Sequence, residues 1–373
     1  MSQTPRESRR FDLDWLRVLA VLLLIPFHSA LVFNLDPNSI VYLKDAVHSP
    51  VLSAAAGFVH VWHMPLLFFI AGASTWFALG FRTAGKYANE RLLRLLVPFL
   101  FGLVAFIPPM TYIHYLGRAN LPTFGQYLAR FFTDFADLTG VRGGFTPAHL
   151  WFIMFLFVFS LAGLPVFLAL RGDRGRRFIA WLGGWVGQAG VLFLLVVPLA
   201  LAAAPDILGD KNPLYYFAVF MAGYLLTADE RIQKAIERQA FVALALGVAA
   251  YVALQWLRAY RFAPWSPAWV GTELTWQLAR WTWLLAWLGL GRRFLNFANR
   301  ALRYLSEACY PVYILHLPIL TLVAWLVIRL QANVAVKYSL IVGLTVAAAF
   351  ALYEIAGRLG VLRFLFGMKR KIS

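Results

Sequence analysis

Residues 11–33 read FDLDWLRVLAVLLLIPFHSALVF, an apolar run that is long enough to cross a bilayer as one helix. The run carries the ionisable side chains Asp14, Arg17 and His28, as well as Asp12 at its start. At about 100° per residue, His28 is offset from Arg17 by about 20° and from Asp14 by about 40°. The three side chains therefore share one helix face, and His28 lies about 16 Å deeper than Arg17.

Ionisable groups near the middle of a bilayer are costly, and by default they face a protein interior or a wet cavity that serves function. His28 is therefore the first candidate for a functional residue. A simpler interpretation stays open, in which Arg17 extends to the lipid headgroups with Asp14 as its partner and His28 is a satisfied core group. Pro26 should kink the helix and free a backbone carbonyl close to His28.

The composition predicts an all-α, polytopic membrane protein. The chain has 373 residues, of which 61% are hydrophobic and 14% are charged, and its mean hydropathy is +0.69. Apolar stretches of about 20 residues recur along the whole chain, so we expect a single transmembrane domain over residues 1–373. We predict about ten transmembrane helices, at residues 15–35, 54–80, 92–115, 148–170, 178–204, 213–227, 238–258, 272–290, 307–328 and 334–357. The long connection at 116–147 is expected to hold a short amphipathic helix on the outer surface.

The distribution of positive charge predicts the orientation of the chain. With the N-terminus placed inside, 24 of the 34 lysines and arginines fall in the inner segments and nine in the outer ones, while Arg280 lies within a span. This asymmetry predicts that both termini are cytoplasmic. The net charge of +17 then reflects topology, so no nucleic-acid partner is expected. The single cysteine, Cys309, excludes an intrachain disulfide and argues against a cysteine-based metal site.

A second basic group lies at the inner end of the third predicted span. Arg91 and Arg94 are three residues apart, which predicts that both guanidinium groups lie on one helix face, and Pro98 follows them. Two such groups are suited to clamp phosphates. The alternative is that both arginines only anchor the helix at the inner surface of the membrane.

The ninth predicted span begins with SEACYPVYILH, residues 306–316. Glu307 and Tyr310 lie near its inner mouth, and His316 reaches about the same depth as His28. Tyr313 lies one turn before His316 and can share its face.

Three further histidines lie on neighbouring spans. His60 and His63 are one turn apart on the second span, and His149 begins the fourth. We expect His28, His63 and His316 to converge on a central cavity. No metal site is predicted, because no histidine spacing is diagnostic and no intramembrane carboxylate lies beside these residues.

Taken together, these motifs resemble the acyltransferase 3 family of integral-membrane acyltransferases. The resemblance covers nearly the whole chain and rests on Asp14-Trp-Leu-Arg17, Arg17-x10-His28, Phe68-Phe69-Ile70-Ala71-Gly72, Arg91-x2-Arg94 with Pro98, His149-Leu-Trp151, Phe220-Met-Ala-Gly223-Tyr224, and Ser306-Glu307, Tyr310-Pro311, Tyr313 and His316.

Two short segments are similar to one branch of this family. His60–Pro65 (HVWHMP) and Phe366–Lys369 (FGMK) resemble the glucan biosynthesis protein C-like proteins, which decorate periplasmic glucans with acyl groups. The chain departs from the family pattern at Ala71, where many members have serine, so no role is carried over to that position. Cys309 also stands where serine is common.

The resemblance implies an O-acyltransferase of the cytoplasmic (inner) membrane. Its co-substrate would be cytoplasmic acyl-CoA (acetyl or succinyl), its acceptor a hydroxyl of an extracytoplasmic carbohydrate or glucan, and no cofactor would be permanently bound. The resemblance and the residue pattern together assign catalysis to His28, as a general base or a transient acyl carrier. The supporting catalytic candidates are Asp14, Glu307 and His316, and the candidates for binding acyl-CoA are Arg17, Arg91, Arg94 and Tyr310.

A transporter or channel is the alternative function, because intramembrane ionisable groups also line solute pathways. Three features of the sequence argue against it. Broken Gly/Pro helices do not recur in matching halves, no inverted repeat is visible, and the polar residues cluster on the inner side and at mid-depth. A purely structural membrane protein ranks third, since it would have no reason to bury three histidines.

Overall fold

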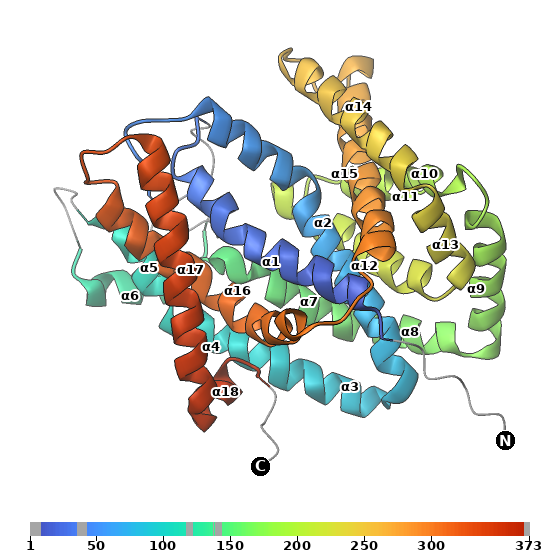
Figure 1. The fold of residues 1–373 in the computed structure, drawn as a ribbon, viewed down its shortest axis with the longest axis horizontal. Coiled ribbons are helices and arrows are strands. Elements are labelled where there is room, and N and C mark those ends of the chain that lie inside the picture. The colour runs from blue at the N-terminus through green and yellow to red at the C-terminus, as the bar shows by residue number, and fades with distance from the viewer. Residues whose placement is uncertain (1–8, 36–42, 117–121, 137, 139–143, 369–373) are drawn as a thin grey trace. The chain divides into compact units, whose positions relative to one another are not determined.

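The computed structural model describes residues 9–35, 43–116, 122–136, 138 and 144–368, and every regular element in these ranges is a helix (Figure 1). The chain forms two compact units, which are described separately. Unit 1 comprises Met1–Ala20, Val61–Phe77 and Phe167–Ser306, and unit 2 comprises Val21–His60, Ala78–Val166 and Glu307–Ser373.

Six helical segments of the described chain are long and apolar enough to cross a membrane. They are α1 (Phe11–Leu31), α2 (Pro50–Phe81), the segment Ala84–Tyr115, α14 (Ala240–Arg258), α16 (Arg300–Val327) and α17 (Val334–Arg358). Two bent helix pairs raise the number to as many as eight. One pair is Ala148–Ala162 with Leu164–Arg171, bent by 47°, and the other is Asp173–Val186 with Val191–Ala203, bent by 113°.

Each of the ten predicted spans contains helix, and the polytopic class is supported, but the number ten stays a prediction. The sixth predicted span is α12 (Pro213–Thr227), whose 15 residues are fewer than the roughly 20 that a bilayer requires. The eighth is α15 (Pro267–Phe294), which carries Glu273, Arg280, Arg292 and Arg293 within a single helix.

The third predicted span is not one regular helix. After α3 (Ala84–Arg91), a π-helical turn, η1 (Leu92–Leu96), leads into α4 (Val97–Ala105), α5 (Ile107–Tyr112) and a 3-10 turn, η2 (Ile113–Tyr115). Pro98 has no N–H to donate, and the preceding amide of Val97 donates five residues back, to the carbonyl of Leu92. The proline thus explains the local widening of the helix.

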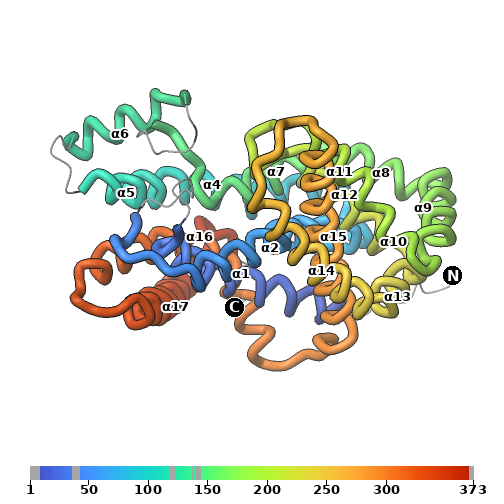
Figure 2. The backbone as a smooth tube through the Cα atoms, turned by 90° about the horizontal axis from the view of Figure 1, so that it is seen from above, coloured from blue at the N-terminus to red at the C-terminus, as the bar shows by residue number. Residues whose placement is uncertain are grey.

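Unit 2 contains the predicted amphipathic helix of the 116–147 connection. This is α6 (Phe124–Thr133), which buries Tyr127 and Phe131 and exposes Phe124 and Phe132. It lies beside α5 (Figure 2), and the hydroxyls of Thr111 and Tyr127 form a 2.5 Å hydrogen bond between the two helices. Residues 117–121, 137 and 139–143 of this connection lie outside the described residues.

Burial of its hydroxyl also affects the acidity of Tyr127. Desolvation raises the pKa of the Tyr127 hydroxyl to about 12, although the hydrogen bond to Thr111 acts in the opposite direction. This phenol therefore stays protonated at neutral pH and can keep its bond to Thr111.

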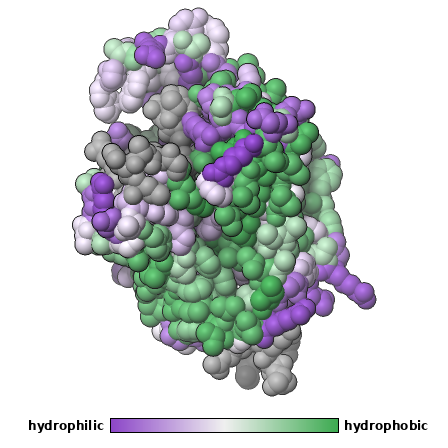
Figure 3. All heavy atoms as spheres, turned by 90° about the vertical axis from the view of Figure 1, so that its left-hand side faces the viewer, coloured by the Kyte–Doolittle hydropathy of each residue, from purple (hydrophilic) through white to green (hydrophobic). Residues whose placement is uncertain are grey.

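An ion pair joins two distant segments of unit 2 in its interior. Lys337 at the start of α17 contacts Asp45 at 2.7 Å, and both side chains are nearly fully buried. Lys337 also donates to the carbonyl of Ile328 at 3.0 Å. The exposed side of α17 is apolar, with Leu340, Leu344 and Leu352 at the surface. Figure 3, which views the left-hand side of Figure 1, shows hydrophobic atoms over the middle of that face and hydrophilic residues toward its ends.

In unit 1, two glycines allow α2 and α12 to pack in direct backbone contact. A Cβ at Gly72 would lie 1.9 Å from the carbonyl oxygen of Phe220, and one at Gly223 would lie 2.1 Å from that of Phe69. The glycines of the FFIAG and FMAGY motifs therefore serve helix packing, because no larger residue fits at either position.

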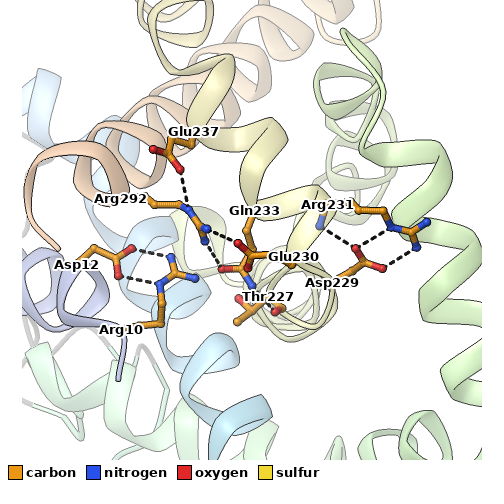
Figure 4. A network of polar contacts seen from close by, with 9 residues as sticks. All are labelled: Arg10, Asp12, Thr227, Asp229, Glu230, Arg231, Gln233, Glu237 and Arg292. Carbon is orange, nitrogen blue, oxygen red and sulfur yellow. Dashed lines mark hydrogen bonds and ion pairs between the residues drawn. The ribbon is translucent and has the colours of Figure 1, made fainter. Parts of the chain in front are cut away.

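The rest of unit 1 includes an antiparallel pair of helices, α14 and α15 (Figures 1 and 2). At the C-terminal end of α15, Arg292 donates to Gln233 and Glu237 at 2.8 Å each and pairs with Glu230, all on or at α13 (Glu230–Arg238). Figure 4 shows this network together with the neighbouring pair of Arg10 and Asp12.

Candidate active site

Three histidines from three different elements form one cluster in unit 2. They are His28 of α1, His149 of the 3-10 turn η3 (Ala148–Leu150) and His316 of α16. The ring centroids of His28 and His316 are 5.3 Å apart, and those of His149 and His316 are 5.0 Å apart. His316 is 1% exposed and His149 8%, whereas His28 is only half-buried. His28 is thus the accessible member of the histidine cluster.

His149 is held by two hydrogen bonds to α16, one at its ring and one at its main-chain carbonyl. Its Nε2 lies 3.0 Å from the carbonyl oxygen of Ile314, and its own carbonyl accepts a hydrogen bond from the hydroxyl of Tyr313. The Ile314 carbonyl is available because its usual helical partner would be the amide of residue 318, which is Pro318 and has no N–H. A carbonyl only accepts, so Nε2 of His149 carries the proton and Nδ1 carries a lone pair.

The same argument fixes the tautomer of His316. Its Nδ1 lies 2.5 Å from the carbonyl oxygen of Tyr313 and must therefore carry the proton, which leaves the lone pair on Nε2. Nε2 of His316 and Nδ1 of His149 are both buried, and neither has a hydrogen-bond partner within the described ranges. The histidine cluster thus contains two sheltered, unpartnered basic nitrogens.

Unpartnered buried acceptors are uncommon, and they point to a donor that binds during function. A hydroxyl group is such a donor. A neutral imidazole in hydrogen-bond reach of a hydroxyl can act as a general base. In the part of the chain that the structure describes, no group of three or more His, Cys, Asp or Glu residues is arranged to hold a metal ion.

Two local features set the positions of the histidines. Pro26 lies inside α1 two residues before His28, and its carbonyl accepts a 3.3 Å bond from the hydroxyl of Tyr338 on α17. Ala148, just before His149, has a φ of +43°, which is uncommon for a residue with a side chain. The hydroxyl of Thr146 accepts the Ala148 amide at 3.0 Å and supports this turn.

Arg91, Arg94 and Tyr310 all lie in unit 2. Arg91 is at the end of α3, where its guanidinium lies 4.5 Å from the ring centroid of Tyr87, and its Nε is buried without a hydrogen-bond partner. Arg94 is inside the π-helical turn, half-buried, and has no hydrogen-bond or ion-pair partner among the described residues. The buried hydroxyl of Tyr310 is also unpartnered, and it interacts electrostatically with Arg91.

The FGMK segment packs against this group. Phe366 is 4% exposed, and its ring lies 5.4 Å from that of Phe101. A Cβ added at Gly367 would lie 3.0 Å from both Pro98 and Tyr310 and 3.1 Å from the carbonyl oxygen of Arg94. Lys369 of the motif lies outside the described residues.

Asp14 and Arg17 belong to unit 1, on the first part of α1. Asp14 accepts from Arg17 at 2.8 Å and from Arg9 at 3.0 Å, so it pairs with two guanidinium groups. Asp14 is therefore placed to orient Arg17, and its catalytic role stays a prediction.

Two other predicted candidates have interactions of their own. His63, in unit 1, hydrogen-bonds through Nε2 to the carbonyl of Ala20 at 2.6 Å, as a buried structural histidine would. Glu307 is exposed on α16, and its charge acts on Tyr353 of α17.

The comparison with known families decides the class of the protein. The sequence pattern of the acyltransferase 3 family, described as an acyltransferase domain, matches residues 10–354. The chain belongs to the acyltransferase 3 family. It is thus an acyltransferase, transferring groups other than aminoacyl groups, and the transporter alternative is not favoured. No curated protein and no solved structure matches the chain.

Within this acyltransferase 3 protein, sequence reasoning missed His149 as a partner of His316. The two residues are far apart in sequence, and the contact depends on tertiary packing. One signal was present: the pair His316 and Pro318 on one helix indicates a free carbonyl, at Ile314, close to a buried imidazole.

Proposed function

We propose that the chain moves an acyl group, acetyl or succinyl, from cytoplasmic acyl-CoA to a hydroxyl of an extracytoplasmic carbohydrate or glucan. The observation that carries this proposal is the histidine cluster, in which an accessible imidazole stands beside two buried ones with unpartnered lone pairs. The resemblance of HVWHMP and FGMK to the glucan biosynthesis protein C-like branch supports a glucan as the acceptor.

In the proposed reaction, His28 removes the proton from the acceptor hydroxyl as the oxygen attacks the thioester carbon. The new ester C–O bond forms, the C–S bond breaks, and the imidazolium returns the proton to the departing CoA thiolate. His316 stands next to His28 and orients it, while His149 holds the position of His316. The second form of the mechanism has His28 accept the acyl group first and pass it to the hydroxyl.

Binding of acyl-CoA is assigned to Arg17, Arg91, Arg94 and Tyr310. The strongest support is for Arg94, whose half-buried guanidinium has no partner within the described residues and is free to bind phosphate. Arg91 offers an unpartnered Nε close to the Tyr310 hydroxyl. Arg17 already pairs with Asp14, so we expect it to contribute less than Arg94.

The test supplies radiolabelled acetyl-CoA or succinyl-CoA to inside-out and right-side-out vesicles and measures label in glycans. Wild type should transfer label only when the cytoplasmic side is accessible. Loss of a general base costs about 10²–10⁴-fold in rate, so His28→Ala should lose at least about 100-fold. His60→Ala is the matched control, because His60 is an exposed histidine outside the cluster. Equal labelling by wild type and His28→Ala would refute the catalytic role of His28.

An experiment on the enzyme without its acceptor distinguishes the two forms of the mechanism. Incubation with acyl-CoA in the absence of acceptor, followed by mass spectrometry of the intact protein, should show an acyl adduct on His28 only if the histidine carries the acyl group. CoA affinity of Arg94→Ala tests the phosphate clamp. An unchanged affinity would leave Arg94 as a membrane anchor.

A further inference from the structure

A second group of sheltered polar side chains lies in unit 1, on α15, and the proposed acyl transfer does not use it. Arg280 and Gln277 are each 5% exposed. Nε of Arg280 and Oε1 of Gln277 are buried, and neither atom has a hydrogen-bond partner in the described part of the chain. The two residues are three apart, so their side chains lie next to each other on the helix surface.

Aromatic rings flank the guanidinium of Arg280 on two sides. Its central carbon lies 4.5 Å from the ring centroid of Tyr215 on α12 and 4.7 Å from that of Trp276, one turn earlier on α15. The exposed Arg258 lies 4.2 Å from the same Trp276 ring. The group therefore extends from an exposed cation, across one indole, to a buried cation.

The aromatic rings stabilise the charge of Arg280 but do not replace an acceptor for its Nε–H. A guanidinium stays protonated in proteins, and its N–H donors lie in its plane, toward the edges, whereas a cation–π contact uses its face. Among the described residues, no carboxylate forms an ion pair with Arg280. The buried cation thus lacks the counter-charge that such groups normally have.

Two other sheltered cations of this chain have acidic partners. Arg292, three turns further along α15, contacts Glu230, Glu237 and Gln233 (Figure 4), and Lys337 of unit 2 pairs with Asp45. Arg280 differs from these two cations, and it is accompanied by an unpartnered acceptor on Gln277. A ligand with both an anion and a hydroxyl would satisfy both atoms.

We propose that Arg280 and Gln277 form a binding site for a phosphate or carboxylate that has a hydroxyl group next to it. The anion accepts from Nε–H of Arg280, and the hydroxyl donates to Oε1 of Gln277. An acidic or phosphorylated sugar presents these groups, and so does the headgroup of an anionic glycerolipid. Binding at this site does not depend on the proposed acyl transfer.

The test measures equilibrium binding of glucose 6-phosphate to the purified full chain, with no acyl donor present. Wild type should bind glucose 6-phosphate saturably, inorganic phosphate more weakly and glucose not measurably. Arg280→Gln should lower the affinity for glucose 6-phosphate at least about tenfold, the expected effect of losing one charge-assisted hydrogen bond. Arg258→Gln is the matched control, because it removes a cation from the same indole at an exposed position, and its affinity should stay close to that of wild type.

Lipid nanodiscs separate the two sources of the ligand. Competition by phosphatidylglycerol, but not by phosphatidylcholine, would identify a lipid headgroup, whereas no competition by either would identify a water-soluble sugar. If Arg280→Gln does not fold, Gln277→Leu replaces it, and this variant should weaken glucose 6-phosphate binding without changing the affinity for inorganic phosphate.

Three results would overturn the proposed site: no saturable binding of glucose 6-phosphate by folded wild type, an unchanged affinity for it in Arg280→Gln, or an unchanged affinity for it in Gln277→Leu. His28→Ala should bind glucose 6-phosphate as wild type does. Failure of acyl transfer and failure of this site are therefore distinguishable.

Discussion

Gly367 closes the last turn of unit 2 in a left-handed conformation, with a φ of +63°. A Cβ there would lie 3.0 Å from both Pro98 and Tyr310 and 3.1 Å from the carbonyl oxygen of Arg94. Gly367→Ala should lower the free energy of unfolding by about 1–2 kcal/mol from backbone strain alone, and more if these neighbours cannot shift. Thermal unfolding in detergent measures the loss.

Gly343→Ala provides the control for this prediction. Gly343 lies inside α17, where a Cβ would meet no atom within 4 Å, and alanine is the better helix former by up to about 1 kcal/mol. This variant should be as stable as wild type or more stable. Equal unfolding temperatures for Gly367→Ala and wild type would show that the FGMK turn is not held as described.

His149→Phe keeps a ring of similar size but removes both nitrogens. If the unpartnered lone pair on Nδ1 serves the reaction, kcat should fall about 10–100-fold while the KM for acyl-CoA changes little, because His149 is not a predicted CoA contact. Initial-rate measurements over a range of acyl-CoA concentrations separate the two parameters. A fall in thermal stability with unchanged kcat would identify His149 as a packing residue only.

At the residue scale, helix geometry predicted part of the site. The depth of His28 and His316 followed from counting residues along two helices, and their rings are neighbours in unit 2. His149 was not predicted as their partner because the turn that carries it depends on the positive φ of Ala148, which no local pattern indicates. His63 belongs to the HVWHMP segment. The sequence does not indicate that its partner is the carbonyl of Ala20.

At the scale of the helix, Pro318 is the cause of the bond between His149 and α16. Pro318→Ala would restore an amide N–H that competes for the Ile314 carbonyl. The helix should become more regular and no less stable, yet the loss of one hydrogen bond, about 1 kcal/mol, should slow transfer roughly fivefold. Parallel rate and unfolding measurements check both effects.

Pro311→Ala is the comparison within the same helix. It restores an amide opposite the carbonyl of Glu307, which no histidine contacts in the described residues. If Pro318→Ala and Pro311→Ala slow the reaction equally, helix flexibility rather than the tautomer of His149 is the cause.

Asp229 begins α13 and stabilises it in two ways. It accepts the backbone amide of Arg231 at 2.8 Å and the guanidinium of the same residue. The hydrogen bond from Arg231 holds the pKa of the Asp229 carboxyl below its usual value, so the contribution to stability is fully present above the unfolded pKa of about 3.9. This contribution is lost as the pH falls through the lower pKa of the folded state.

Asp229→Ala should therefore cost about 1 kcal/mol at pH 7, the usual value of an N-cap, and the difference from wild type should shrink as the pH falls through the lowered pKa of the folded state. Unfolding curves at pH 7, 5 and 3 measure this. Asp173→Ala is the control, because its carboxylate also pairs with an arginine but is 80% exposed. A cost for Asp229→Ala that does not depend on pH would contradict the assigned role of the charge.

The number of membrane spans illustrates what helix patterns leave undetermined. The apolar stretch at 178–204 has the length of one span, yet it bends by 113° near Gly190, whose φ is +83°. Glycine tolerates both straight and left-handed backbone, so its presence allows the bend without requiring it. The π-helical turn before Pro98 was likewise unpredicted, although the proline itself indicated an irregularity.

For the molecule as a whole, composition alone identified a helical membrane protein, because a chain that is 61% hydrophobic must satisfy its backbone within helices. The motif glycines were read as family markers, and the structure gives them a physical reason: Gly72 and Gly223 permit backbone contact between α2 and α12. The predicted orientation of the chain in the membrane rests on the asymmetry of its positive charge, which is a property of the entire chain. This orientation can be tested at the two ends of one helix.

The connections that flank α16 provide that test. Ala298 precedes the helix and Ala332 follows it, and both side chains are exposed. The only native cysteine, Cys309, is 5% exposed, so Cys309→Ser provides a background without reactive thiols. The charge count places the arginines before α16 inside, which predicts that Ala298→Cys is cytoplasmic and Ala332→Cys is external.

A membrane-impermeant maleimide applied to right-side-out vesicles should therefore label Ala332→Cys and not Ala298→Cys, and inside-out vesicles should give the opposite pattern. Labelling of both positions from one side would mean that α16 does not cross the membrane. The reversed pattern would place the arginines before α16 outside, and the proposed direction of acyl transfer from the cytoplasm would then be wrong. This one measurement therefore constrains the topology and the proposed mechanism together.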